Sequence, residues 1–187
     1  MSAPTIESKA QELFADLGYE KTSLALIAKE AGIKKQTVYS HYKNKEELFC
    51  TIAKTVLKNE IYFISLFFSK DAPPAELVSS FAQLMKKRLR KPEDSSARFM
   101  LRLIVEAEYT EGKVFLEYSL QYQKHLEKSL ASAFIRQGIQ PQKANSLSMT
   151  CSAFFAGLFL FLNYEDDSIF EEHLSGSMYL WEQILKV

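Results

Sequence analysis

The chain has 187 residues, with 23 Lys and Arg against 23 Asp and Glu, so its formal net charge is zero and it cannot bind nucleic acid through bulk positive charge. Two cysteines are too few for a disulfide framework or a four-ligand zinc site, and we expect neither a metal nor a cofactor. The first residues lack the apolar stretch of a secretory signal, and the longest apolar run, 153–162, is about half of the roughly 20 residues that cross a bilayer. We therefore expect a cytoplasmic protein without a membrane span.

Apolar residues recur at helical spacing along the chain, which predicts an all-α protein. Start and stop signals divide it into about nine helices, over 5–18, 22–31, 35–41, 44–69, 74–91, 94–110, 113–137, 141–164 and 167–186. Gly32 permits a tight turn with positive φ, and Asn44 with Glu47 forms a capping box for the long fourth helix. We predict a three-helix head over 1–45 and a larger helical body over 46–187.

Positive charge is concentrated in the head. Residues 21–45 carry six lysines against Glu30, a formal charge of +5, whereas residues 1–20 carry a formal charge of −3. Ala28, Gly32 and Val38 fall at the spacing of a helix-turn-helix, in which small and apolar residues let two short helices pack around a tight turn. This segment is the candidate DNA-binding element.

The head resembles the DNA-binding head of the TetR family of bacterial transcriptional regulators over about residues 6–49. The resemblance rests on Leu13-Phe14, Gly18-Tyr19, Thr22-Ser23, Ile27-Ala28, Ala31-Gly32-Ile33, Thr37-Val38-Tyr39, His41-Tyr42 and Lys43-Asn44-Lys45-Glu46-Glu47-Leu48. The rest of the chain matches that family only in helix count and length. The resemblance implies a dimeric regulator whose body binds a small-molecule effector.

The second helix of a helix-turn-helix enters the major groove by its N-terminal end, where lysine and glutamine side chains pair with base edges. The candidate DNA-binding residues are Thr22, Ser23, Lys34, Lys35, Gln36, Thr37, Tyr39, His41 and Lys45. Tyr39 and His41 are included because they resemble the family's backbone-contacting residues, and Lys45 because it begins a helix whose free amides favour phosphate. The alternative for the lysines is a solvated face. We expect Val38 and Tyr42 in the head core, and Tyr39 could be a core residue or a DNA contact. Lys34 lacks the hydroxyl that often caps this helix in the family.

A homodimer is expected, because one head covers few base pairs and two heads about 34 Å apart reach successive major grooves. The predicted eighth helix carries two apolar stripes, one for its own core and one for the same helix of a second copy. The candidate dimer interface residues are Ala153, Ala156, Gly157, Leu160, Met178 and Trp181. The alternative is a helix buried within a monomer.

Aromatic residues of the body are candidates for the effector pocket that the resemblance implies, with tyrosine, histidine and arginine as polar groups. They are Phe63, Phe67, Phe81, Met85, Phe99, Arg102, Leu103, Tyr118, Tyr122 and His125, and the alternative is that they form plain core.

These observations predict a ligand-responsive transcriptional regulator, most simply a repressor that a hydrophobic or aromatic effector releases from a near-palindromic DNA operator. The alternatives are a helical ligand-binding or adaptor protein that does not bind DNA, and an enzyme. Against an enzyme, the sequence has no Gly-x-Ser-x-Gly, Gly-x-Gly-x-x-Gly or His-Glu-x-x-His motif and no phosphate loop, and its three histidines lie in separate regions.

Overall fold

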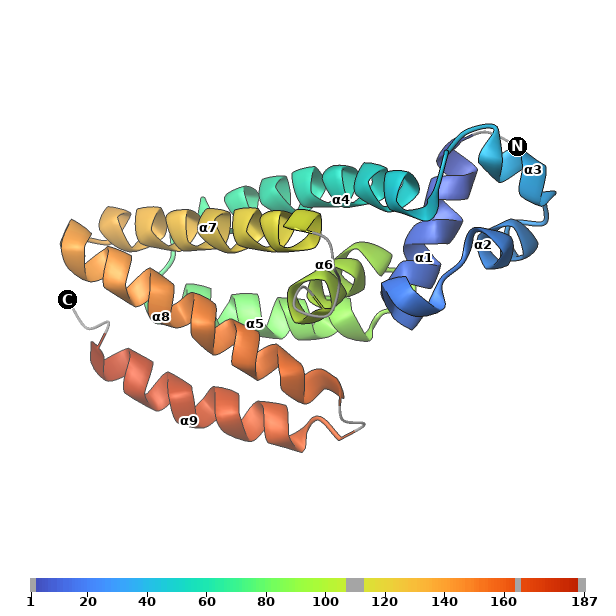
Figure 1. Cartoon of the computed structure of the whole chain (residues 1–187). Coiled ribbons are helices and arrows are strands. Elements are labelled where there is room, and N and C mark those ends of the chain that lie inside the picture. Colours follow the sequence, from blue (N-terminus) through green and yellow to red (C-terminus); the bar gives the residue numbers. More distant parts are fainter. Residues whose placement is uncertain (1–2, 107–112, 164–165, 185–187) are drawn as a thin grey trace. The chain divides into compact units, whose positions relative to one another are not determined.

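The computed structural model describes residues 3–106, 113–163 and 166–184, and the regular elements of this part of the chain are all helices, as predicted (Figure 1). Its helices are α1 (Ala3–Lys21), α2 (Leu24–Glu30), α3 (Lys35–Tyr39), α4 (Lys45–Phe68), α5 (Pro74–Arg90), α6 (Ser95–Glu106), α7 (Lys113–Arg136), α8 (Pro141–Leu160), the 3-10 turn η1 (Phe161–Asn163) and α9 (Ser168–Ile184). Of the helices so described, none combines the length and the apolar character that a membrane crossing requires.

Helix boundaries follow the predicted ones closely. Within α1, Gly18 adopts φ 80° and interrupts the helical backbone at the predicted stop. The third helix ends at Tyr39, two residues earlier than predicted, because the chain tightens after Ser40: the His41 amide donates to the Val38 carbonyl, three positions back, at 3.0 Å. The last four residues of the predicted sixth helix, 107–110, lie outside the described residues.

The chain forms two compact units. Unit 1 comprises Met1–Glu60 and Glu93–Gln121, and unit 2 comprises Ile61–Pro92 and Tyr122–Val187, so α4 and α7 each contribute residues to both. The predicted boundary at residue 45 separates a DNA-binding head from the body by function, and the grouping into two compact units does not test this boundary.

Unit 1 joins the head to α6 and the start of α7. The buried side chains of Ile6, Ala10 and Phe14 lie on one face of α1, and a polar seam fastens this helix to α6. In the seam, Gln11 Nε2 donates to Ser95 Oγ at 2.8 Å, and the Arg98 guanidinium lies 2.9 Å from the Asp16 carboxylate. Helix α6 is therefore bound to the head by interactions that pair residues more than 80 positions apart.

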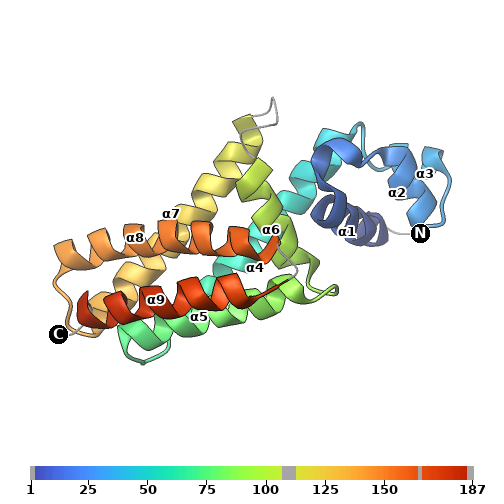
Figure 2. The ribbon, with the colours of Figure 1, turned by 90° about the horizontal axis from the view of Figure 1, so that it is seen from below.

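Unit 2 contains α5, α8 and α9, with α8 and α9 side by side (Figure 2). Its core contains Phe81 and Phe155, whose ring centroids lie 5.0 Å apart. Two cations of α5 bind the beginning of α9: Lys86 Nζ lies 3.0 Å from Asp167, and Arg90 lies 2.5 Å from the same carboxylate. The pKa of Asp167 is lowered by the hydrogen bonds that it accepts from Arg90 and Lys86.

Candidate nucleic-acid interface

The turn between α2 and α3 has the geometry that the sequence predicts. Gly32 adopts φ 66°, and the Ile33 amide donates to the Ala28 carbonyl at 2.9 Å, which closes the end of α2. Ala28 and Val38 are buried, so the two short helices pack through a small and an apolar residue. As predicted, Lys34 begins α3 without a side-chain capping bond.

The N-terminal end of α3 faces solvent. Lys34, Lys35 and Gln36 are exposed, and Thr37 is half-buried. Tyr39 is 49% exposed, and its ring lies 5.5 Å from the Lys35 ammonium. The exposed side of this short helix thus carries two ammonium groups and an amide at its start and a phenol at its end, which offer hydrogen-bond donors to an extended polyanion.

The two hydroxyl residues predicted to contact DNA before α2, Thr22 and Ser23, differ in exposure. Ser23 is exposed and accepts a hydrogen bond from the Leu26 amide at 3.1 Å, which caps the helix. Thr22 is only 1% exposed, and its hydroxyl lies 2.8 Å from the Gly18 carbonyl and 3.2 Å from the Leu13 carbonyl. Thr22 therefore fixes the corner between α1 and α2, and we leave it out of the DNA-binding surface.

The start of α4 has the predicted capping box. The Asn44 side chain accepts from the Glu47 amide at 2.8 Å, and the Glu47 carboxylate accepts from the Lys43 amide at 2.7 Å. Lys45 turns back to the head: its ammonium donates to the Tyr19 carbonyl at 2.9 Å and lies 3.9 Å from the Tyr19 ring centroid. The Lys45 ammonium thus stabilises the fold of the head, and its remaining N–H groups are available to donate to a phosphate.

The two aromatic or basic residues after α3 differ in exposure. His41 is exposed. Tyr42 is buried in the head, where its hydroxyl donates to the Glu7 carboxylate at 2.5 Å and burial raises its pKa. This supports the interpretation of Tyr42 as a core residue of the head.

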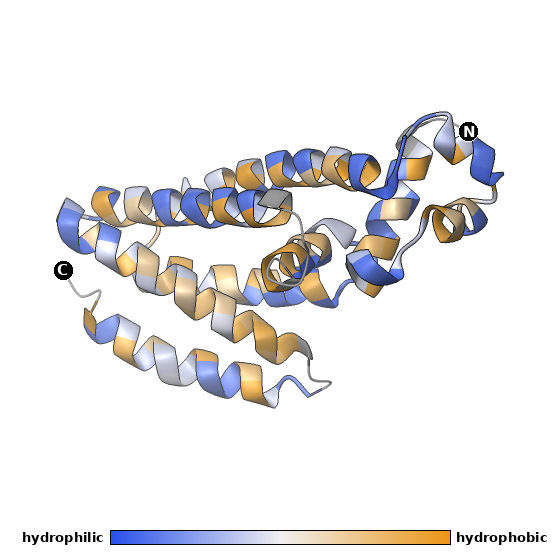
Figure 3. Ribbon diagram, in the orientation of Figure 1, coloured by the Kyte–Doolittle hydropathy of each residue, from blue (hydrophilic) through white to orange (hydrophobic). Residues whose placement is uncertain are grey.

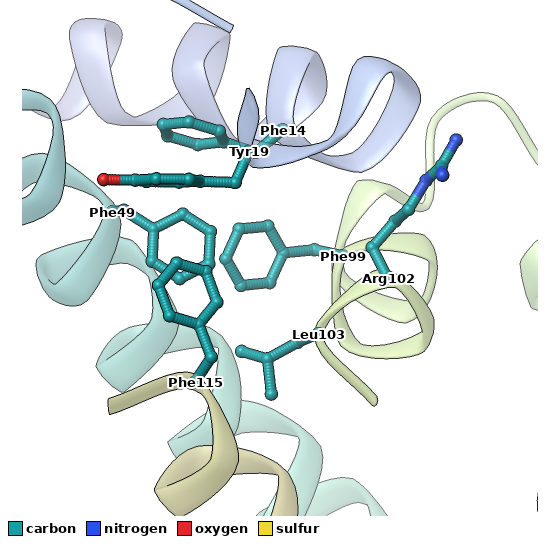
Figure 4. Close-up of a pocket in the computed structure, with 7 residues that line it drawn as sticks. All are labelled: Phe14, Tyr19, Phe49, Phe99, Arg102, Leu103 and Phe115. Carbon is teal, nitrogen blue, oxygen red and sulfur yellow. The ribbon is translucent and has the colours of Figure 1, made fainter. Parts of the chain in front are cut away.

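The candidate effector residues divide between the two units. Phe99, Arg102, Leu103 and Tyr118 belong to unit 1, and Phe63, Phe67, Phe81, Met85, Tyr122 and His125 belong to unit 2. In unit 1, Phe99, Arg102 and Leu103 line a small hollow with Phe14, Tyr19, Phe49 and Phe115 (Figure 4). The hollow measures about 10 Å³, room for about one water, because its rings pack closely: Phe49 and Phe115 stack at 4.3 Å.

In unit 2 most of these side chains pack against one another. Phe67, Phe81 and Met85 are buried, whereas Phe63 is half-buried with the Arg88 guanidinium 4.2 Å from its ring centroid. His125 faces a different surface, where its Nε2 lies 2.7 Å from Ser65 Oγ.

The candidate dimer residues also differ in their exposure. Ala153, Ala156, Gly157 and Leu160 form an exposed stripe along α8, whose C-terminal half is hydrophobic (Figure 3). Trp181 is only 6% exposed and packs within unit 2, with its ring 6.4 Å from that of Phe154, and Met178 is half-buried.

Sequence reasoning missed three exposed apolar side chains of the same two helices: Met149 on α8, and Tyr179 and Leu180 on α9, which are 61%, 67% and 60% exposed. Helical spacing carried the signal, because Met149 precedes Ala153 by four positions and Leu180 follows Gly176 by four.

A helix-turn-helix with an exposed cationic helix, joined to further helices without a strand among the described residues, defines the class of DNA-binding transcriptional regulators. A family model described as "Bacterial regulatory proteins, tetR family" matches residues 6–51. The head of the chain therefore carries a DNA-binding domain of the TetR family.

Known proteins are similar in the head, in the fold, or in both. YhgD of Bacillus subtilis, an uncharacterized HTH-type transcriptional regulator, is 47% identical over 49 residues, 26% of each chain. IcaR of Staphylococcus epidermidis, the negative transcriptional regulator of the biofilm operon icaADBC, is 46% identical over 44 residues, 24% of each chain. The chain thus spans about a quarter of the length of either relative. A TetR transcriptional regulator from Legionella pneumophila shares the fold at a TM-score of 0.76 and 16% identity, covering 97% of this chain and 96% of its own.

Proposed function

We propose that the protein is a transcriptional repressor that binds a near-palindromic DNA operator as a homodimer and is released by a small hydrophobic or aromatic effector. The observation that carries this proposal is the exposed N-terminal end of α3, with Lys34, Lys35 and Gln36. Such a protein acts in the bacterial cytoplasm, where the DNA is. IcaR, which resembles the head, is itself named a negative regulator.

In the proposed complex, α3 lies in the major groove. Lys35 donates to guanine O6 or N7, Gln36 pairs with adenine, and the Thr37 methyl contacts a thymine methyl. Ser23, Lys34, Tyr39, His41 and Lys45 contact the phosphate backbone, which fixes the position of the head without specifying sequence.

The support for a homodimer is the exposed apolar surface of α8 and α9. Ala153, Ala156 and Gly157 are small, so a second α8 can approach closely, and Leu160 is 45% exposed beside them. Leu180 on α9 takes the place that sequence reasoning gave to the buried Trp181. Apolar patches of this kind on a soluble chain mark contacts with other proteins.

The support for effector control is the seam between α1 and α6. The Arg102 guanidinium donates to the Ala15 carbonyl at 3.3 Å and to the Asp16 carbonyl at 3.1 Å, and Arg98 pairs with the Asp16 side chain. An effector that displaces α6 therefore displaces α1 with it. Such an effector must bind the arrangement of the protein that does not bind DNA more tightly than the arrangement that does. A difference of about 3 kcal/mol between these two binding free energies weakens DNA binding on the order of a hundredfold.

The test is selection of bound duplexes from a random library, followed by affinity measurements over a range of salt concentrations. Lys35→Ala should weaken binding and reduce the log–log salt slope by about 0.9 if one phosphate contact is lost, or relax the sequence preference if a base contact is lost. Lys124→Ala, at an exposed lysine of α7 in unit 2, is the control that should leave both unchanged.

If Lys34→Ala and Lys35→Ala both bind every selected duplex like the unaltered protein, the operator proposal is wrong. A helical ligand-binding or adaptor protein is then the better description.

A further inference from the structure

A polar groove lies on the surface of unit 2 between α4 and α7. It measures about 200 Å³ and is lined by Ser65 and Phe68 of α4, by Ser69 just after this helix, and by His125, Lys128, Ser129, Ser132 and Arg136 of α7. We call it the serine groove. Four hydroxyls and three basic side chains make it unlike the aromatic core of unit 2.

Hydrogen bonds orient the groove's side chains. Ser65 Oγ donates to the Ile61 carbonyl at 2.8 Å, so its single proton is used there and the hydroxyl accepts from His125 Nε2 at 2.7 Å. His125 Nδ1 then carries the second proton only in the imidazolium form. The Arg136 guanidinium donates to the Phe68 carbonyl, which anchors one arm of the planar group and leaves others to donate.

The groove lining contains Lys128 and Arg136 and no carboxylate; Asp71, which accepts a hydrogen bond from Gln137 beside Arg136 in the sequence, is not part of the lining. Among the described residues, no carboxylate forms an ion pair with Lys128 or Arg136. Residues 61–69, at the end of α4 and just after it, carry no charged side chain, and Glu127 is the only acidic residue of 122–136 on α7. Burial, and after it the neighbouring Lys128 ammonium, lowers the pKa of His125.

We propose that the serine groove binds the phosphate group of a small molecule, with Arg136 and Lys128 as its cationic ligands and Ser129 and His125 as further donors. A guanidinium fork and an ammonium are the side chains that best match phosphate oxygens. The volume exceeds that of several waters, so the groove has room for a phosphate together with part of an organic group. The source of the phosphate is either the free ion or an organic monoester.

This site is distinct from the effector proposal, which concerns an apolar ligand, and it does not depend on DNA binding. Its test therefore fails or succeeds separately from that of the repressor.

The experiment follows the imidazole resonances of the three histidines by NMR while inorganic phosphate or glycerol phosphate is added, with chloride at matched ionic strength as the control. His125→Gln assigns the His125 signal. Bound phosphate should raise the pKa of His125, because an anion favours the imidazolium, and should leave His41 and His173 unchanged.

Lys128→Gln should raise the pKa of His125 in the absence of phosphate and weaken phosphate binding about tenfold, the loss of one charge-assisted contact. Lys124→Gln removes an equally exposed charge one turn earlier on α7, outside the groove lining, and should change neither quantity by as much.

Saturable binding of either phosphate supports the site, and a preference for the ester over the free ion identifies the source. The proposal is overturned if chloride reproduces the His125 shift, if all three histidines shift alike, or if Lys124→Gln weakens binding as much as Lys128→Gln.

Discussion

Gly157 allows the proposed dimer to be tested without disturbing the fold of one chain. A Cβ atom built on Gly157 meets no other atom within 4 Å, and the residue is exposed on α8. Gly157→Glu should therefore fold, and it should gain about 0.5–1 kcal/mol in helix stability because glycine is a poor helix former. Within a homodimer through α8, however, the same change places a carboxylate in an apolar contact.

The expected effect on dimerisation is large because two-fold symmetry introduces the substitution twice. Burying a carboxylate without a partner costs about 3 kcal/mol, so two copies cost about 6 kcal/mol and raise the dimer dissociation constant roughly ten-thousandfold. Sedimentation equilibrium should then find the variant at the mass of one chain, with its helix content by circular dichroism intact and its operator affinity reduced.

Gln142→Glu is the matched control, because Gln142 is exposed near the polar N-terminal end of α8 and the substitution adds the same charge. The control should remain dimeric. If Gly157→Glu also remains dimeric at the concentrations where the unaltered protein is, α8 does not make the contact and the dimer must form through another surface.

Three further changes test the packing and electrostatics of the two units. Phe49→Leu removes ring contacts at 4.3–5.1 Å and should lower the free energy of unfolding by about 1–2 kcal/mol in urea titrations. Tyr62→Leu, at a side chain that is 70% exposed, is the control and should change this free energy by less than about 0.5 kcal/mol. Equal effects of the two variants would contradict a stabilising aromatic cluster around Phe49. Thr22→Val keeps the shape but removes the hydroxyl bonded to two carbonyls, and should cost about 1–2 kcal/mol in the same assay, an expectation that a neutral result refutes. The pKa of Asp167 is lowered beside Arg90, so the ion pair stabilises the fold above the ordinary aspartate pKa, and this stabilisation is lost as pH falls through the lower folded value. Asp167→Asn should therefore flatten the acid side of the curve of unfolding free energy against pH, by a measurable amount below about 1 kcal/mol. An unchanged curve would show that the ion pair contributes nothing.

The helix-turn-helix could be predicted from sequence because its determinants are local. The Gly32 turn, the Ser23 cap and the capping box at Asn44 each depend on residues within a few positions of one another. The orientation of neighbouring side chains still needed coordinates. Thr22 and Ser23 are adjacent and chemically alike, but the corner between α1 and α2 turns one inward and the other outward.

The body was harder to predict because its side chains carry the same chemistry whether they line a pocket, fill a core or meet a partner. Phenylalanine spacing identifies an apolar face without saying what covers it. Trp181 and Leu180 are neighbours on α9, both suited to an interface by composition, and the rotation of the helix buries the first and exposes the second. Such a rotation is set by packing against α5 and α8, which lie far away in sequence.

The seam between α1 and α6 shows what such long-range packing adds to function. The paired charges of Asp16 and Arg98 are separated by more than 80 positions, and no local pattern connects them. Because of this pair and the neighbouring contacts, α6 belongs to the same compact unit as the head. A displacement of α6 is therefore transmitted directly to α1, because the contacts of the seam either move the two helices together or must break. Breaking the seam costs buried packing and several hydrogen bonds, so joint movement is the cheaper response to an effector.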